Sequence, residues 1–287
     1  MFSLSYLFKE VKKIFRYPKS LFRVVYGWDS VGSYISESTK RDYANNPVSE
    51  KKANGYFIFI NPEDRIGVSP SIGVYGNYYE VAETELLKKI VKKGYTVVDV
   101  GANIGWYTLL SARIVGKNGK VVAFEPEPVN YALLKKSLEK NNFENVLLSD
   151  YCVSNMAGIR KLWLHGLNLG AHSTVRKISE RAIDVEAVTL DSFLSKLEIQ
   201  RVDLLKVDVE GAEPEVFEGA REYLLKRKIQ NIFFEWNREV WTDKEKLLKK
   251  LLEYYDLFQI IQSPFLIRKQ PQSFLSHCQP RLVSKTP

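Results

Sequence analysis

Cysteine and histidine are scarce in this chain of 287 residues, and their positions build no metal site. The two cysteines, Cys152 and Cys278, are too few for a disulfide framework and match no zinc spacing. Cys152 falls in a predicted strand, where we expect a buried and inert thiol. The three histidines, at positions 165, 172 and 277, form no spaced pair of ligands. The sequence therefore predicts no metal centre based on cysteine or histidine.

Long apolar runs are also lacking. The chain contains no stretch of about 18 apolar residues, so we expect no membrane-spanning helix. Residues 1–28 lack a compact apolar core followed by a small-residue cleavage site, so we expect no signal peptide and a cytoplasmic protein. The hydrophobic content of 45% and the aromatic content of 13% are globular values. The length suits one α/β domain of about 200 residues with an N-terminal extension.

Acidic residues are outnumbered: the net charge is +8 and the isoelectric point is about 9.2. Residues 1–28 hold six lysines and arginines against one glutamate. Within them, residues 2–16 carry apolar side chains at helical spacing with lysines between, which predicts a basic amphipathic helix. Such a helix lies on an anionic membrane surface, or it packs against the domain or a second subunit. The sequence leaves both alternatives open and does not define an oligomeric state.

A glycine turn follows a strand of β-branched residues that ends near Asp99, as expected for a strand covered on both faces. Gly101 permits a tight turn with positive φ, and Gly105 lets the following helix pack close to the sheet. A dinucleotide site needs a second glycine for the pyrophosphate, and Asn103 stands at about that place. No Gly-Lys-Ser/Thr follows, which excludes a Walker loop. A ligand with a ribose but no pyrophosphate fits better, and a plain structural turn is the alternative.

Glu125 ends the next predicted strand. In a doubly wound sheet this position lies across the strand tips, within reach of a ribose diol. We also assign Glu80, near the start of the helix before the first strand, to the cofactor side of the site. Both assignments predict a nucleoside ligand at the glycine turn.

Strands alternate with helices at the spacing of βαβ units, which predicts a mainly parallel, doubly wound α/β sheet with helices on both faces. We expect a seven-stranded main sheet with a C-terminal antiparallel hairpin, and three parts: an N-terminal helical extension over residues 1–75, the domain over 76–270 and a polar tail over 271–287. The predicted strands cover residues 56–60, 96–100, 120–125, 145–149, 185–190 (edge type), 202–209, 229–235, 257–262 and 264–269, with a strand or hairpin over 151–164. The predicted helices cover residues 75–93, 105–115, 128–141, 190–197 (with Asp191 as a cap), 214–227 and 242–254, and residues 62–70 form a loop or hairpin.

Acidic side chains gather where two of these strands end. Asp208 lies at the end of the strand over residues 202–209 and Glu210 follows it, and Glu235 ends the strand over 229–235. The carboxyl ends of parallel strands meet at one edge, so these acids converge near the face that holds Glu125. Strand alternation places Lys206 on the same face as Asp208, and a buried lysine needs an acid. The structural interpretation of Lys206 is an ion pair with Asp208 or Glu235.

These motifs resemble the FkbM-type S-adenosylmethionine-dependent methyltransferases over about residues 76–262. The similarity lies in Asp99-Val-Gly-Ala-Asn-Ile-Gly105, in Phe124-Glu-Pro126, and above all in Leu205-Lys-Val-Asp-Val-Glu-Gly-Ala-Glu213 with Gly219-Ala220. The resemblance implies a class I, Rossmann-like methyltransferase fold, S-adenosylmethionine as cofactor, and methyl transfer to hydroxyl oxygens of sugars, polyketides and related small molecules. It places Asp99, Gly101, Asn103 and Gly105 at the cofactor turn, Glu125 on the ribose, and Asp208 and Glu210 on the acceptor side. The first 75 residues have no counterpart, which leaves the acceptor open.

Methyl transfer requires an acceptor oxygen in line with the methyl group and a base for its proton. The candidate catalytic residues are Asp208, Glu210, Glu235, Lys206 with a lowered pKa, and His172. His172 matches the family pattern loosely, and the alternative is a solvated histidine in a loop. Asp208, Glu235 and Asn237 could instead hold Mg²⁺, as strand-tip acids do in catechol O-methyltransferase-like enzymes. Without a third acid of fixed spacing, a metal site is not favoured.

Two other functions fit less well. The basic isoelectric point permits an RNA methyltransferase, but the chain has neither an Asn/Asp-Pro-Pro-Tyr run for a flipped adenine nor a Pro-Cys nucleophile for a cytosine. A non-catalytic Rossmann-like binding module is disfavoured because Asp99, Asn103, Glu125 and Asp208 are all in place. We therefore expect an O-methyltransferase with a small-molecule or glycan acceptor, without nucleic acid and with peripheral membrane contact as an option.

Overall fold

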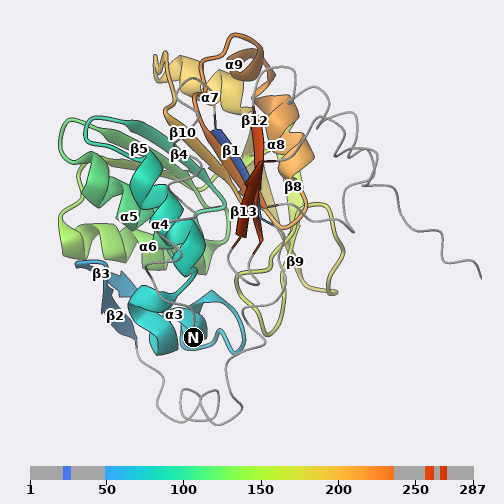
Figure 1. Ribbon diagram of the computed structural model, residues 1–287. Coiled ribbons are helices and arrows are strands. Elements are labelled where there is room, and N and C mark those ends of the chain that lie inside the picture. The colour runs from blue at the N-terminus through green and yellow to red at the C-terminus, as the bar shows by residue number, and fades with distance from the viewer. Residues whose placement is uncertain (1–21, 27–48, 236–255, 262–265, 270–287) are drawn as a thin grey trace, which may run out of the picture.

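The computed structural model describes residues 22–26, 49–235, 256–261 and 266–269 (Figure 1). Its main sheet has the strand order β13-β12-β1-β11-β10-β4-β5-β6. Every neighbouring pair is parallel except β12 with β13. The prediction of a mainly parallel α/β sheet is confirmed, although the described residues form eight strands in it rather than seven.

Five neighbouring strands form the part of this sheet from β11 to β6 and agree with their predicted ranges to within a few residues. They are β4 (Thr96–Val100), β5 (Lys120–Phe124), β6 (Val146–Ser149), β10 (Leu204–Val207) and β11 (Ile232–Glu235). All residues of β10 and β11 are buried, because both faces of the sheet are covered. The chain runs β4-β5-β6 in one direction and β10-β11 in the other, so the topology switches between β4 and β10. Ligands bind at such a switch point.

Helices cover both faces (Figure 1). On one face, α4 (Val81–Ile90), α5 (Trp106–Val115) and α6 (Pro128–Asn141) share an apolar core with inward residues of β4 and β5. On the other face, α7 (Leu190–Lys196), α8 (Glu213–Gly219) and α9 (Arg221–Leu225) form a second core. Two cores on opposite faces are the packing that a doubly wound sheet requires.

The outer part of the sheet joins segments from both ends of the described chain. β1 (Phe22–Tyr26) lies between β11 and β12 (Asp256–Ile261), and β12 pairs antiparallel with β13 (Leu266–Lys269). The predicted helices over residues 2–16 and 242–254 and the polar tail lie outside the described residues. In the part that the structure describes, no helix combines the length and apolar character needed to cross a membrane.

The segment before β4 differs from the prediction. The expected loop over residues 62–70 contains the start of α3 (Val68–Tyr75), and the expected helix over 75–93 is divided into a 3₁₀ turn η2 (Gly76–Tyr78) and α4. Gly76 at φ 53° and Glu80 at φ 41° interrupt the helical backbone there. Buried Asp64 accepts hydrogen bonds from the backbone N–H groups of Gly67 and Ser69, which fixes the start of α3.

Two smaller sheets complete the fold. β2 (Glu50–Ala53) and β3 (Tyr56–Phe59) form a hairpin, and the second sheet has the order β7-β9-β8. In that sheet β7 (Cys152–Val153) is parallel to β9 (Ala182–Val188), and β8 (Gly158–Trp163) is antiparallel to it. The predictions of an edge strand over 185–190 and of a hairpin within 151–164 were therefore wrong, because β9 is the middle strand and separates β7 from β8.

The predicted cap of α7 was also wrong. Thr189 accepts the hydrogen bond from the backbone N–H of Ser192 and caps this helix. Asp191 instead accepts from the backbone N–H groups of Glu222 and Tyr223 at the start of α9. The carboxylate therefore ties one helix to the first turn of another.

Candidate functional site

The glycine turn between β4 and α5 has the backbone that the sequence predicts. Gly101 lies at φ 78° and Gly105 at φ 101°. A Cβ on Gly101 would stand 1.8 Å from the carbonyl oxygen of Asp208, and one on Gly105 would stand 2.3 Å from Cδ1 of Leu134. The lack of a side chain at Gly101 therefore lets the end of β10 approach the turn, and the lack of one at Gly105 lets α6 pack against the start of α5.

Asn103 and Glu125 close the turn together. Asn103 adopts φ 53°, and its backbone N–H donates to Oε2 of Glu125 at 2.7 Å. Oε1 of Glu125 accepts from the backbone N–H of Glu127 at 3.0 Å. Burial raises the pKa of Glu125 to about 7, although the two backbone hydrogen bonds oppose the rise. The acid predicted to hold a ribose thus also holds the turn in shape.

Lys206 lies directly opposite Asp99 in the register of β10 and β4. Its Nζ donates to the carbonyl oxygen of Gly101 at 2.9 Å, lies 3.1 Å from Oδ1 of Asp99 and lies 3.7 Å from Oδ2 of Asp208. Burial alone would lower the pKa of Lys206, but Asp99 and Asp208 outweigh it, and the pKa is raised. A protonated, ion-paired lysine does not fit the role of a base. The pairing with Asp208 was predicted, and the closer partner Asp99 was missed.

Asp99 is buried behind the turn rather than exposed to a ligand. It is 1% exposed, and its Oδ2 accepts from the hydroxyl of Thr108 at 2.6 Å. The expectation that Asp99 contacts the cofactor is therefore corrected: its carboxylate positions Lys206 and the start of α5. It acts on the site through its neighbours.

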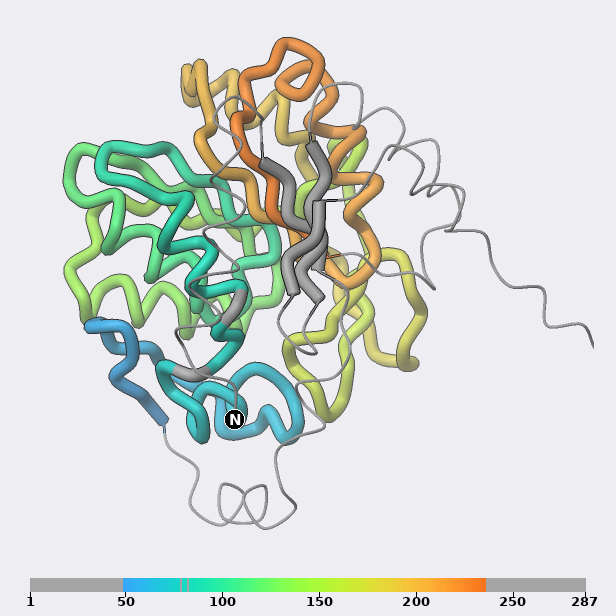
Figure 2. Tube along the Cα trace, in the orientation of Figure 1, coloured from blue at the N-terminus to red at the C-terminus, as the bar shows by residue number. Residues whose placement is uncertain are grey.

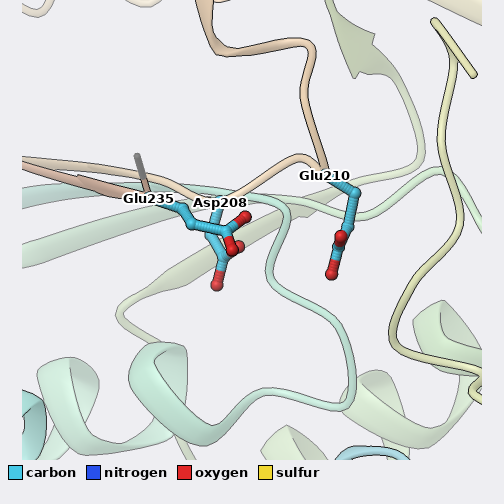
Figure 3. Close-up of side chains that lie close together, drawn as sticks. All are labelled: Asp208, Glu210 and Glu235. Atoms are coloured by element: carbon cyan, nitrogen blue, oxygen red, sulfur yellow. The ribbon is translucent and has the colours of Figure 1, made fainter. Parts of the chain in front are cut away.

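The acids at the strand tips converge as predicted (Figure 3). One carboxylate oxygen from each of Asp208, Glu210 and Glu235 lies within 4.8 Å of the other two. Burial, with the charge of Asp208 next, raises the pKa of Glu210 to about 8 and that of Glu235 to about 10. Arg176, which was not predicted from the sequence, forms an ion pair with Oε2 of Glu210 at 3.1 Å and limits the rise in the pKa of Glu210.

His172 is half-buried in the loop between β8 and β9, not a solvated side chain. Its Nδ1 accepts from the backbone N–H of His165 at 2.9 Å, which assigns the proton of the neutral ring to Nε2. Burial, with His165 next, lowers the pKa of His172 to about 4. A neutral ring that presents an N–H is a donor to a ligand, and this does not fit the predicted role of a base.

Glu80 begins α4 with a left-handed backbone at φ 41°. Its Oε2 accepts a short hydrogen bond from the hydroxyl of Tyr107. Burial, with Glu83 next, raises the pKa of Glu80 to about 7. The sequence offered no partner for Glu80, because Tyr107 comes from the helix after the glycine turn.

The loop between β8 and β9 closes the site from the side of the smaller sheet. The Ser173 hydroxyl and Nε of Arg176 donate to the carbonyl oxygen of Glu210 at 3.0 and 3.2 Å. The backbone N–H of Arg65 donates to the carbonyl oxygen of Leu167 at 3.0 Å. Figure 2 shows this loop beside the segment that precedes α3. The loop is therefore tied to both the strand tips and the start of the described domain.

Two hollows meet over the turn and the acids. One has about 580 Å³ of empty volume and the other about 910 Å³, each partly open to solvent. Both reach Gly101, Asn103, Asp208 and Glu210. The first is also lined by Phe124, Glu125, Tyr151, Gly170, His172 and Thr174, and the second by Tyr79, Glu80, Trp106, Tyr107, Lys206 and Glu235. The predicted cofactor acid and the predicted acceptor acids thus line two hollows that share part of their lining.

A doubly wound sheet with a glycine turn, an acid after the second strand and acids at the switch point defines a Rossmann-like methyltransferase domain. The model of the family described as "Methyltransferase FkbM domain" matches residues 99–259. This is more than half of the chain, and the chain belongs to that family.

Three relatives show how far the similarity reaches. "Methyltransferase sdnD" of Sordaria araneosa is 34% identical over 158 residues, which are 44% of this chain and 60% of the relative. "2-O-methyltransferase NoeI" of Sinorhizobium fredii is 25% identical over 193 residues, 62% of this chain and 77% of the relative. "Hexuronic acid methyltransferase AglP" of Haloferax volcanii is 28% identical over 121 residues, 42% of this chain and 48% of the relative. The match thus spans less than two thirds of sdnD and of AglP.

Proposed function

We propose that the chain is an S-adenosylmethionine-dependent O-methyltransferase whose acceptor is a hydroxyl of a sugar, a glycan or a related small molecule. The observation that carries this proposal is the convergence of three carboxylates at the tips of β10 and β11, on the opening that adjoins the glycine turn. Family membership supports the reaction, and the names of NoeI and AglP support a hydroxyl and a sugar acid as acceptors.

The first hollow fits the nucleoside of the cofactor. Glu125 is placed to accept hydrogen bonds from the ribose hydroxyls, while Gly101 and Asn103 let the chain pass close to the ligand. Phe124 and Tyr151 add apolar surface for a base. The second hollow leaves room beside Glu80 and the acids for the remaining part of the cofactor and the acceptor.

The transfer requires that an acceptor oxygen approach the methyl carbon and lose its proton. When bound, the cofactor would supply a methyl group on a sulfonium, whose C–S bond would break with its electron pair left on sulfur as the acceptor oxygen gained the methyl group. We assign Asp208 as the acceptor of the hydroxyl proton, since its side chain is 27% exposed while that of Glu210 is 16% exposed. Lys206 remains protonated and holds Asp208 near the turn.

Labelled methyl transfer tests the proposal. The purified chain is incubated with methyl-labelled S-adenosylmethionine and a glycan extract, and the products are identified by mass spectrometry. We expect Asp208→Asn and Glu210→Gln to retain cofactor binding in calorimetry while turnover falls about 100-fold or more, the typical contribution of a general base. Asp184→Asn, at an exposed ion pair with Lys161, is the control and should not change turnover.

Three outcomes would count against the proposal. Normal turnover of Asp208→Asn or Glu210→Gln would remove that residue from the chemistry. Label found in RNA alone would favour an RNA methyltransferase. Cofactor binding without transfer to any acceptor would favour a non-catalytic module.

A further inference from the structure

We propose that Asp208, Glu210 and Glu235 bind one hard divalent cation of the Mg²⁺, Mn²⁺ and Ca²⁺ class. Their carboxylate oxygens lie within 4.8 Å of one another, one from each residue. Such a cation holds oxygens at about 2.0–2.6 Å, so two oxygens of one coordination sphere are at most about 4–5 Å apart. The spacing of the three side chains is that of ligands to a single ion.

A second observation is independent of this spacing. Oε2 of Glu235 is buried and has no hydrogen-bond partner among the described residues, and the side chain as a whole is 2% exposed. Figure 3 shows the Glu235 carboxylate close to that of Asp208, with the Glu210 carboxylate beside them. Buried polar atoms are nearly always paired, so an orphaned carboxylate oxygen calls for a ligand.

The neighbouring cations do not fill this role. Lys206 makes its closest contacts with the carbonyl oxygen of Gly101 and with Asp99, and it is 3.7 Å from Asp208. Arg176 reaches Oε2 of Glu210 from the loop between β8 and β9. Among the described residues, Lys206 pairs with Asp208 and Arg176 with Glu210, and neither is a hydrogen-bond partner of Oε2 of Glu235.

The donor set selects the class of metal. The cluster contains carboxylate oxygens and neither imidazole nor thiolate, which suits hard cations rather than zinc or copper. Glu210 is the third acid that the sequence did not assign to a metal site. Its backbone lies in the left-handed region at φ 54°, which turns the residue toward the strand tips. Asn237, the other ligand considered from the sequence, lies outside the described residues.

The cation would also bear on the proposed function, and this part of the inference rests on that function. An acceptor hydroxyl that coordinates a divalent cation is more acidic than a free one, because the metal stabilises the alkoxide. The cluster lines the same hollow as Glu80 and Tyr107. The ion would therefore orient the acceptor and lower the pKa of its hydroxyl.

Manganese binding to the full chain tests the site without any acceptor. The protein is treated with EDTA, desalted and titrated with Mn²⁺ alone, and free Mn²⁺ is measured by electron paramagnetic resonance. We expect one Mn²⁺ per chain. Glu235→Gln and Asp208→Asn should weaken binding by at least about tenfold, since even the loss of an outer partner of a metal ligand costs about 10- to 100-fold. Asp184→Asn, an exposed acid on β9, should bind as the wild type does.

Absence of Mn²⁺ binding, or equal binding by wild type and both variants, would overturn the site. Glu210→Gln provides a further variant in which the carboxylate is partly exposed, in case a change at buried Glu235 prevents folding; circular dichroism checks each protein. Methyl transfer that continues in EDTA with no Mn²⁺ bound would overturn the site and leave the proposed function intact. One bound Mn²⁺ without methyl transfer would support the site and count against the function.

Discussion

Replacement of Lys206 by methionine tests how the strand tips are held together. Lys206 is 3% exposed and Asp99 is 1% exposed, with 3.1 Å between the charged atoms. Methionine keeps an unbranched side chain but removes the charge, so Asp99 stays buried with the hydroxyl of Thr108, at 2.6 Å, as its remaining side-chain partner among the described residues. Breaking one side of a buried pair costs about 3–5 kcal/mol. This is a large part of the roughly 5–15 kcal/mol that stabilises a folded protein.

Two comparisons isolate the cause. Lys161→Met breaks the ion pair with Asp184 at 3.2 Å, in which each side chain is 63% exposed, and should cost less than about 1 kcal/mol. The double variant Lys206→Met/Asp99→Asn removes the stranded charge as well. Its loss should be smaller than the sum of the two single losses by about 1 kcal/mol or more, as expected for residues in direct contact.

Equilibrium unfolding in urea at pH 7 measures these free energies. The reasoning would be refuted if Lys206→Met cost no more than Lys161→Met. The reasoning would also be refuted if the free-energy loss of the double variant equalled the sum of the two single losses, because the two charges would then not interact across β10 and β4.

Four further predictions concern Glu125, the glycine turn and the N-terminal segment. Glu125→Ala should weaken S-adenosylmethionine binding about tenfold or more in calorimetry, since charged hydrogen bonds contribute about 1.5–3 kcal/mol, and unchanged affinity would reject the ribose assignment. Burial raises the pKa of Glu125 from 4.5 to about 7, so the folded state favours the protonated form, and the free energy of unfolding should fall as pH rises from about 4.5 to 7. Glu125→Gln should reduce this pH dependence in urea unfolding. Equal pH dependence of the variant and the wild type would contradict the raised pKa. Gly101→Ala should prevent folding or lower the free energy of unfolding by more than about 4 kcal/mol, because the new Cβ would lie 1.8 Å from the carbonyl oxygen of Asp208. The control Gly94→Ala is also at positive φ but has nothing within 4 Å of the new Cβ, and should lower the free energy of unfolding by about 1–2 kcal/mol in the same assay. If the N-terminal segment contacts anionic membrane, removal of residues 1–21, which spares β1, should abolish salt-sensitive flotation with anionic liposomes, and flotation that ignores both salt and the deletion would exclude this role.

The sequence predicted the central strands because a strand buried on both faces leaves a continuous apolar run, as in β4 and β5. It predicted the glycine turn because few residues other than glycine and asparagine adopt positive φ there. It could not predict that β9 is a middle strand. Alternation of polar and apolar residues reports burial on one face and does not report how many neighbours a strand has.

The site was predictable where the evidence lay within one segment. Strand alternation related Lys206 to Asp208, two residues apart. The pairing of Lys206 with Asp99 depends on the register of two strands more than 100 residues apart, and the contact of Arg176 with Glu210 depends on a loop from the second sheet. Such contacts are set by tertiary packing, so no local sequence pattern predicts them. The same reason explains why the neutral ring of His172 could not be anticipated.

The loop between β8 and β9 brings residues of the small sheet to the wall of the first hollow. The strand tips of the main sheet carry the glycine turn and the acids, whereas Gly170, His172 and Thr174 reach the opening from a loop mounted on the small sheet. The two parts meet through the Ser173 and Arg176 contacts to the Glu210 carbonyl oxygen. A graft that exchanges this loop but keeps those two anchors would alter the wall of the first hollow and leave the glycine turn and the strand-tip acids in place. The fold thus carries two walls of this hollow on two separate sheets, and each wall can be redesigned on its own.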